Sequence, residues 1–575
     1  MDRRVLLAVV LMMAVAIVPS LLLKKPPAGQ SVSRSVGRTD SLRGAPAIGA
    51  VPPAPAEAVQ PTDRPTVPTV LTDKTIVVSS PLYRYVFSTR GGRLIEATLP
   101  QYQSMRPGEK GSLAEMLPPR SDLLSLGLLS GRDTVWLRDW QFEPSATALD
   151  VQGPTPLRLS TRQGGVAVSL VYTFRPDDYM MDIAGTVEGL GPDGGILLVG
   201  MGPGLRNTEA DSAEHARELG VVTKAAKASL TRFGKLKLGQ PMAFNGPFEW
   251  VAVKSKYFVT ALFVPDTTGS GLNGGIGGAT ALAVDTAMKT TTAASITAGI
   301  QVRPSGNFRY QLYAGPMEYP RLRAIGHDFD DVNPYGWPGF RTIIRPVALG
   351  ARSLLVWMHD SLGLAYGVGL ILFGILIRIL LWPLNQKAMR SSMAMQAVAP
   401  MQKQIQEKYK GDALKAQQEI SKLWKEHNVH PLGGCWPMLL PWPILLAFFF
   451  VFQNTIELRG AAFLWLPDLS RPDPVFVIPV VMGLSMYVLT KIGQIGMEPN
   501  PQMKMLLYVM PGMMTFLFLN FPSGLNLYYT VMNIASLPQQ WMLSKERLRR
   551  QAAGAPALPP PLPPPSPKAG KSGRR

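Results

Sequence analysis

The stretch that decides the fold runs from Gly363 to Pro383 and reads GLAYGVGLILFGILIRILLWP. A helix rises about 1.5 Å per residue, so these residues are long enough to cross a hydrocarbon core of roughly 30 Å. The stretch carries one charged residue, Arg378, which lies about one helical turn before Trp382. It predicts a membrane-spanning helix in which the place of Arg378 needs an explanation.

Two explanations of Arg378 remain open from its position alone. In the first, its guanidinium snorkels to the nearer headgroups and has no further role. In the second, Arg378 lies in a polar cavity inside a helix bundle. Gly367, Gly374 and Arg378 recur at helical spacing, so the arginine shares a face of small residues on which neighbouring helices pack. By default, a charge on that face indicates a functional site.

The composition indicates a chain with two compartments. Of its 575 residues 46% are hydrophobic, and the mean hydropathy is +0.10, which suits neither an ordinary soluble protein nor a membrane bundle throughout. The single cysteine, Cys435, excludes an internal disulfide framework, and none of the five histidines has a metal-ligand spacing. We expect no metal and no cofactor. The net charge of +19 is explained most simply by basic loops kept in the cytoplasm.

Apolar runs on both sides of the central stretch bring the number of predicted spans to six. The first is either a retained anchor or a removed signal peptide, and its length favours the anchor. The predicted division is a first span at 1–23, a disordered linker at 24–72, a β domain at 73–345, an amphipathic helix at 346–360, further spans at 361–383, 431–453, 474–491, 504–521 and 522–543, a helical hairpin at 384–430, loops at 454–473 and 492–503, and a basic tail at 544–575.

The region before the central stretch has the pattern of a large all-β domain. Apolar and polar residues alternate in runs such as Val166 to Phe174, with Gly, Pro and Asp between the runs. Arg90, Gly91 and Gly92 indicate a hairpin turn. Nothing in the region converges as a nucleophile, base or metal set, so we expect no enzyme activity. We also expect most of this domain to be dispensable for the work of the membrane part.

Pro346 opens a predicted short amphipathic helix. Val347, Ala351 and Leu355 share one side of it, and Arg352 lies on the other. Such a helix lies either in the membrane interface or against the β domain.

Basic residues set the predicted orientation. Lysine and arginine accumulate in 384–430 and after residue 543, which places both segments and the C-terminus in the cytoplasm and the β domain outside it. The Pro-rich run Pro556 to Pro567 predicts an extended arm with a basic end. That arm contacts ribosomal RNA, anionic lipid or nothing.

The last span carries one polar stripe. Asn526, Tyr529, Asn533, Ser536 and Gln540 follow one another at steps of three and four residues. The stripe either joins helices by side-chain hydrogen bonds or forms a wet groove together with Arg378.

The predicted hairpin carries a row of methionines. Met389, Met393 and Met401 lie at multiples of four residues, and Gly411 with Asp412 indicates the turn to a second helix. Methionine side chains adapt to varied apolar partners. They form either a capture face for hydrophobic segments or the plain core of the hairpin.

Several motifs together resemble the YidC/Oxa family of membrane protein insertases, in its Gram-negative form. They are STRGG at 88–92, Arg378 followed by Pro383, HPLGGCWP at 430–437, ELR at 457–459, DPVFVIP at 473–479 and FPSGLNLYY at 521–529. The resemblance implies a polytopic α-helical membrane protein with a five-helix core, a periplasmic β-supersandwich domain, and a hydrophilic groove closed on the periplasmic side. The groove arginine of the family matches Arg378. Many members have Gln where this chain has Pro441, so the lining of the groove differs there.

The resemblance implies a function without covalent chemistry. The chain is expected to insert nascent inner-membrane proteins into the bacterial inner membrane, alone or beside the Sec translocon. The expected groove is lined by Gly374, Arg378, Asn526, Tyr529 and Asn533. Other expected partners are membrane lipids and the ribosome. A transporter or channel is the alternative, because an intramembrane arginine also marks solute pathways.

Overall fold

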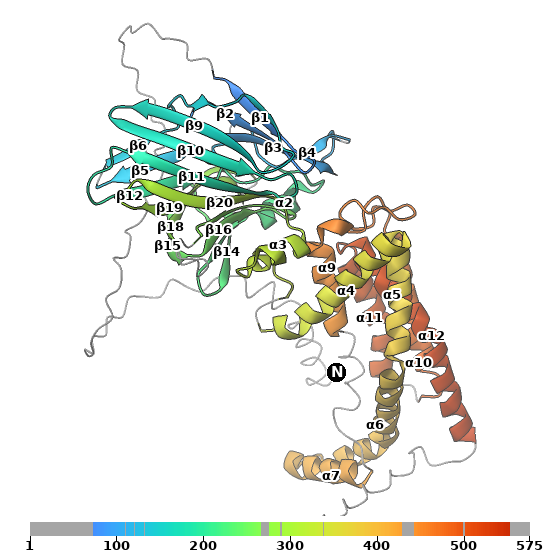
Figure 1. Cartoon of the computed structure of the whole chain (residues 1–575). Helices are drawn as coiled ribbons and strands as arrows, with labels where there is room; N and C mark the ends of the chain where they lie inside the picture. The colour runs from blue at the N-terminus through green and yellow to red at the C-terminus, as the bar shows by residue number, and fades with distance from the viewer. Residues whose placement is uncertain are drawn as a thin grey trace, which may run out of the picture. The chain divides into compact units, whose positions relative to one another are not determined.

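The computed structural model describes residues 73–552 apart from 110, 120, 132, 266–274, 288–289, 337–338, 428–441 and 498–500. Along the chain a sheet-rich part, blue to light green in Figure 1, precedes a helical part, yellow to red. The predictions for the first span, the linker, the Pro-rich run, Cys435 and Pro441 lie outside the described residues.

The largest sheet has nine strands in the order β14, β13, β16, β17, β20, β11, β10, β9 and β7. Their bounds are Ala228–Arg232, Gly220–Lys224, Trp250–Lys254, Phe258–Phe263, Asn307–Pro316, Met180–Glu188, Val166–Phe174, Thr155–Gln163 and Glu143–Pro144, in that order. The predicted alternation is confirmed in β10, where Val168, Leu170, Tyr172 and Phe174 are buried. The predicted β domain is thus a sheet-rich region.

Two smaller sheets accompany it. The six-stranded sheet has the order β15 (Pro241–Phe248), β18 (Ile276–Ala287), β19 (Thr290–Val302), β12 (Gly195–Gly200), β5 (Leu126–Ser130) and β6 (Asp133–Trp136). The five-stranded sheet has the order β4 (Leu113–Glu115), β3 (Leu94–Gln103), β2 (Arg84–Ser88), β1 (Thr75–Ser79) and β8 (Ala148–Asp150). Helix α2 (Ser212–Glu218) and the short helix η1 (Phe233–Lys235) also belong to this part.

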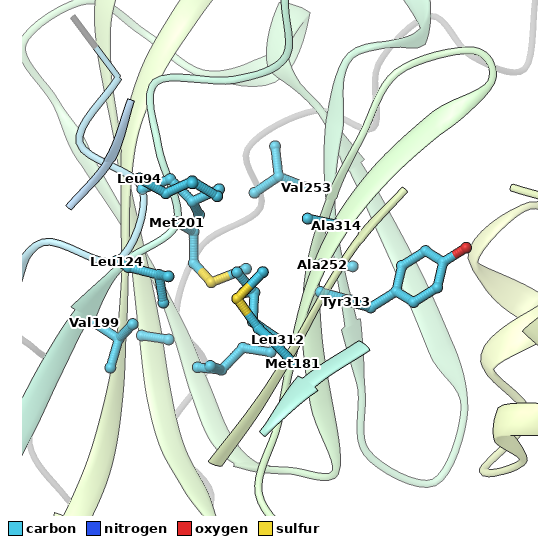
Figure 2. Close-up of a cluster of buried hydrophobic side chains, with 14 of the residues drawn as sticks. Leu94, Leu124, Met181, Val199, Met201, Ala252, Val253, Leu312, Tyr313 and Ala314 are labelled. Carbon is cyan, nitrogen blue, oxygen red and sulfur yellow. The ribbon is translucent and has the colours of Figure 1, made fainter. Parts of the chain in front are cut away.

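An apolar core lies between the sheets. Figure 2 shows Leu94, Leu124, Val199 and Met201 facing Met181, Val253 and Leu312 across it. Met181 and Met201 are both almost fully buried, and their unbranched side chains fill irregular gaps between the strands. Burial of apolar surface, at about 25 cal/mol per Å², is the main term that stabilises this region.

The turn predicted at Arg90 to Gly92 connects β2 and β3. Gly91 and Gly92 have φ angles of 80° and 61°, values that glycine adopts without strain. A Cβ atom on Gly91 would lie 2.7 Å from the carbonyl oxygen of Arg138. The motif therefore has a steric cause.

The helical part begins with α3 (Tyr319–Ile325) and η2 (Phe329–Val332). The helices that follow are α4 (Arg341–Leu362), α5 (Tyr366–Leu380), α6 (Trp382–Lys408), α7 (Ala413–Glu426), α9 (Trp442–Asn454), η4 (Ile456–Leu458), α10 (Val477–Gly493), α11 (Pro501–Phe518) and α12 (Ser523–Ala552). None of the helices that the structure describes is both long enough and apolar enough to span a bilayer. The number of spans and their orientation remain predictions from the sequence.

Helix α4 corrects two details of the predicted amphipathic helix. It starts at Arg341 and not at Pro346, because Arg341 and Arg345 form ion pairs with Asp331 and Asp330 that fix an extra turn; the proline removes only one backbone donor there. Arg352 was expected on the polar side, but it is buried.

The burial of Arg352 has a local cause. The guanidinium forms an ion pair with Glu457 and lies over the ring of Tyr319 at 5.6 Å. On the opposite face of α4, Ile343 and Trp357 are exposed.

The helices of this part pack around a second apolar core. Helix α4 contacts α9 and α5, and α12 contacts α5, α9 and α10. Phe373, Phe448 and Tyr528 meet at the junction of α5, α9 and α12. The ring centroids of Phe373 and Phe448 are 5.0 Å apart, and those of Phe448 and Tyr528 are 4.1 Å apart. This aromatic cluster lies about one turn before Arg378 along α5.

Candidate functional site

Arg378 lies in the last turn of α5 and is 8% exposed. Its Nη2 donates a hydrogen bond of 2.6 Å to Oε1 of Gln539 on α12. Its Nε has no hydrogen-bond partner within the described part of the chain, and no ion pair is recorded there for Arg378. The guanidinium is therefore buried against a neutral amide.

Gly374, one turn before Arg378, brings α5 and α12 together. A Cβ atom on this glycine would lie 3.0 Å from Cγ1 of Val531 and 3.7 Å from Cδ2 of Tyr528. A larger residue would push the helices apart. Gly374 thus places the surface of α12 where Arg378 can reach it.

Gln539 was not predicted as a site residue. Its Oε1 accepts from Arg378, and its Nε2 donates to the carbonyl oxygen of Trp382 at 3.1 Å. The sequence pattern pointed to the neighbouring Gln540, which lies near Gly493 of α10. Both glutamines continue the stripe from Ser536, at a step of three or of four residues, so periodicity alone does not decide between them.

The remaining predicted groove residues lie along α12. Nδ2 of Asn533 donates to Oγ of Ser485 on α10 at 3.1 Å, so this residue joins two helices. Nδ2 of Asn526 donates to the carbonyl oxygen of Phe518 at 3.0 Å, whereas its Oδ1 is buried without a partner among the described residues. The ring of Tyr529 stacks on Phe518 at 5.8 Å. The stripe therefore serves partly as helix-joining contacts.

The cost of the two unpartnered atoms is considerable. A buried donor or acceptor without a partner costs about 1–3 kcal/mol, and more when the group is charged. Arg378 Nε and Asn526 Oδ1 both belong to this class. A polar partner at either atom would recover this cost.

The hairpin forms a small core of its own. Val398 of α6 and Leu423 of α7 are buried, and Ile405 and Trp424 pack against them. Met401 is exposed, which leaves it free of that core. The side chains of Met389 and Met393 lie outside the part that the structure describes.

The sheet-rich part contains buried charges with partners. Lys256 forms an ion pair of 2.9 Å with Glu214. Burial alone would lower the pKa of Lys256, but Tyr257 and Glu214 beside it raise the pKa instead. Burial lowers the pKa of His215. Within the described ranges no group of three or more His, Cys, Asp or Glu residues is placed to hold a metal ion.

Two sequence families together cover most of the chain. Residues 75–348 match the family described as the YidC periplasmic domain, and residues 357–551 match the 60Kd inner membrane protein family. The chain is therefore of the class of inner membrane proteins that carry a periplasmic domain.

Curated relatives narrow this class. The chain is 30% identical over 579 residues to the membrane protein insertase YidC of Chlorobaculum tepidum, covering 94% of each chain. It is 29% identical over 571 residues to that of Syntrophus aciditrophicus, covering 95% of this chain and 100% of the relative. It is 31% identical over 503 residues to that of Oleidesulfovibrio alaskensis, covering 82% of this chain and 86% of the relative. The chain belongs to the YidC family of membrane protein insertases, and the resemblance seen in its motifs is confirmed.

Two solved structures show weaker likeness. A crystal structure of an active YidC insertase with the first transmembrane domain resolved is 18% identical and covers 82% of this chain and 93% of that chain, at a TM-score of 0.34. A galactose mutarotase related enzyme from Lactobacillus acidophilus is 11% identical, and the match covers 42% of this chain and 97% of that chain at a TM-score of 0.27. Neither likeness is close enough to support a statement about this protein.

Proposed function

We propose that the chain inserts hydrophobic segments of nascent proteins into the bacterial inner membrane through a hydrophilic groove that contains Arg378. The observation that supports this most strongly is the burial of Arg378 against Gln539, without a carboxylate among the described residues. A charge kept in an apolar helix bundle at such a cost is usually functional. Gly374, Asn526, Tyr529 and Asn533 complete the proposed groove.

The proposed mechanism shortens the dry path of the substrate. Each charge or unsatisfied backbone group that enters hydrocarbon costs several kcal/mol. Water in the groove keeps a short polar tail solvated for part of the way, and Arg378 attracts acidic residues of that tail. The apolar segment then moves sideways into lipid, because burial of its surface contributes about 25 cal/mol per Å².

The aromatic cluster of Phe373, Phe448 and Tyr528 supports a groove that is closed on one side. It lies toward the N-terminal end of α5 from Arg378. In the proposed topology that end faces the periplasm, so the cluster would separate the polar site from the periplasm. The exposed Met401 supports a role of the hairpin in meeting substrates first.

The proposed architecture has six membrane-spanning helices, five of them in the insertase core, with the predicted domain boundaries. The β domain is a periplasmic supersandwich, and the C-terminus is cytoplasmic. Proposed partners are nascent inner-membrane proteins, the Sec translocon, membrane lipids, and the ribosome at the basic tail and hairpin. Insertion needs no covalent step, so the proposed activity is not that of an enzyme.

Substitution of Arg378 tests the proposal. Arg378→Lys should keep most of the insertion activity in proteoliposomes, because the attraction is largely that of a point charge. Arg378→Ala should slow insertion of a substrate with an acidic tail about tenfold and that of a matched neutral tail by less than about twofold. Lys491→Ala, at an exposed site on α10, is the control. Equal insertion of both substrates by wild type and Arg378→Ala would support snorkelling instead.

A further inference from the structure

Arg459, which follows η4 in the ELR motif, is bound by the sheet-rich part of the chain. Its side chain is 3% exposed. Nε donates to both carboxylate oxygens of Glu209 at 3.0 Å. Nη1 donates to the carbonyl oxygen of Gln103 at 2.8 Å, and Nη2 donates to that of Thr208 at 3.1 Å. Each nitrogen of the guanidinium thus has an acceptor.

Aromatic rings complete the surroundings of this arginine. The guanidinium lies 5.6 Å from the ring centre of Phe258 and 6.0 Å from that of Tyr257, within the range of cation–π attraction. These acceptors and rings form what we call the Arg459 socket: Gln103, Thr208, Glu209, Tyr257 and Phe258. The socket matches the planar, forked shape of a guanidinium, which a lysine lacks.

The same turn is also held from its other side. Two residues before Arg459, Glu457 forms the ion pair with Arg352 of α4. Nδ2 of Asn454, at the end of α9, donates to the carbonyl oxygen of Pro334 at 3.0 Å. Thr455 and Tyr335 share a hydrogen bond of 3.2 Å between their hydroxyl groups. The turn after α9 is therefore fixed to the sheet-rich part, to the segment before α4 and to α4 itself.

A connection between two helices does not need such contacts. Arg471 lies in the same connection between α9 and α10, and it is exposed to solvent. Burying an arginine–carboxylate pair costs desolvation, which only good geometry offsets, and loss of one partner then leaves a buried charge unpaired. The contrast between Arg459 and Arg471 indicates that the position of the turn itself is fixed.

We propose that Arg459 is a positioning residue. Its socket holds the turn after α9 on the sheet-rich part, and Glu457 relays this position to α4. Since α9 packs on both α4 and α12, the arrangement fixes one wall of the helical part that carries Arg378. Deletion of the β domain would remove Gln103 and Glu209, so a positioning role of Arg459 runs against the expectation from the sequence that most of this domain is dispensable. We call the attachment of the turn after α9 to the Arg459 socket the joint. The effect on insertion rests on the proposed function, whereas the joint does not.

Amide hydrogen exchange on the full chain in lipid tests the joint directly. Arg459→Ala should speed exchange of 454–460 and of 103–105 by at least about tenfold, with α10 unchanged. Arg459→Lys should give an intermediate exchange rate. Arg471→Ala is the matched control and should exchange at the wild-type rate. Arg459→Ala combined with Glu209→Ala should open the turn no further than the worse single variant, because the two side chains act as one pair. Wild-type exchange in Arg459→Ala would overturn the joint.

Insertion assays on the same variants test the positioning role. Arg459→Ala should slow insertion about two- to tenfold for acidic and neutral tails alike, with Arg459→Lys between it and wild type. Glu209→Gln provides a second route if Arg459→Ala does not accumulate in the membrane. Faster exchange with unchanged insertion would overturn the positioning role. A wild-type protein that inserts nothing would refute the proposed function, while the exchange data would still decide the joint.

Discussion

Lys224, Lys254 and Lys256 in the sheet-rich part are buried as deeply as Arg378 in the helical part. Each of these lysines has a carboxylate partner. The distance from Nζ to the carboxylate oxygen is 2.8 Å for Lys224, 3.7 Å for Lys254 and 2.9 Å for Lys256. Arg378 has the neutral amide of Gln539. A buried ion pair costs desolvation to form, and removing one partner is strongly destabilising because it leaves the other charge buried and unpaired. The buried lysines therefore help to hold the fold of the first region, and the contrast supports our proposal that Arg378 in the second region is kept available for a substrate.

Arg459 shows that this difference does not follow from residue type. It is an arginine of the helical part, yet Glu209 and two carbonyl groups satisfy it. A helical region can therefore pair an arginine when position is all that matters. The lack of a carboxylate near Arg378 among the described residues is then a property of that site.

The largest effect on stability is expected from breaking a pair in the sheet-rich part. Glu214→Ala leaves Lys256 buried without its carboxylate and should lower the free energy of unfolding by about 3 kcal/mol. Denaturant unfolding followed by the tryptophan signal measures this. Glu188→Ala, in the exposed pair with Arg162, should change it by less than about 1 kcal/mol. Similar losses in both variants would remove the distinction between buried and exposed pairs.

A smaller effect is expected at the contact that places Arg378. Gly374→Leu forces α5 away from Val531 and Tyr528 and should cost about 1–3 kcal/mol of stability. Insertion should fall as well, since Gln539 moves out of reach of Arg378. Gly512→Leu on α11 is the matched control, because a Cβ atom there meets nothing within 4 Å. Wild-type insertion by Gly374→Leu would show that the approach of α5 and α12 is not needed.

The smallest effect concerns pH. Because burial lowers the pKa of His215, the folded state binds a proton less well than the unfolded state. The stability linked to neutral His215 is fully present above the unfolded pKa, about 6.5, and is lost as the pH falls below it. The midpoint of thermal unfolding should therefore drop on acidification, with a shallower slope in His215→Gln. The exposed His327→Gln serves as control, and equal slopes in all three proteins would contradict the assignment.

Much of the fold could be predicted from the sequence. Alternation identified β10, and two glycines identified the turn that joins β2 and β3, because both signals are local. The start of α4 could not be predicted: two arginines pair with aspartates ten and fifteen residues earlier in the chain and override the proline. Arg352 was placed on the wrong face for a similar reason, since its partner Glu457 is 105 residues away.

The candidate site shows the same limit. Arg378 and Gly374 were identified from spacing within one helix. Gln539 was missed because two adjacent glutamines fit the stripe, and only the packing of α5 on α12 decides which one faces Arg378. The socket of Arg459 leaves no periodic signal either, since its members come from three distant segments.

Substitution of Gln539 by glutamate gives Arg378 the carboxylate partner that the buried lysines have. In Gln539→Glu, the charge of Arg378 is neutralised by a carboxylate in place of the amide. We expect this variant to be at least as stable as wild type, to insert an acidic-tailed substrate about tenfold more slowly, and to insert a neutral-tailed one within about twofold of wild type. Gln540→Glu, one residue further, should leave both rates unchanged. Wild-type insertion of the acidic-tailed substrate by Gln539→Glu would show that insertion does not need the unpaired charge of Arg378.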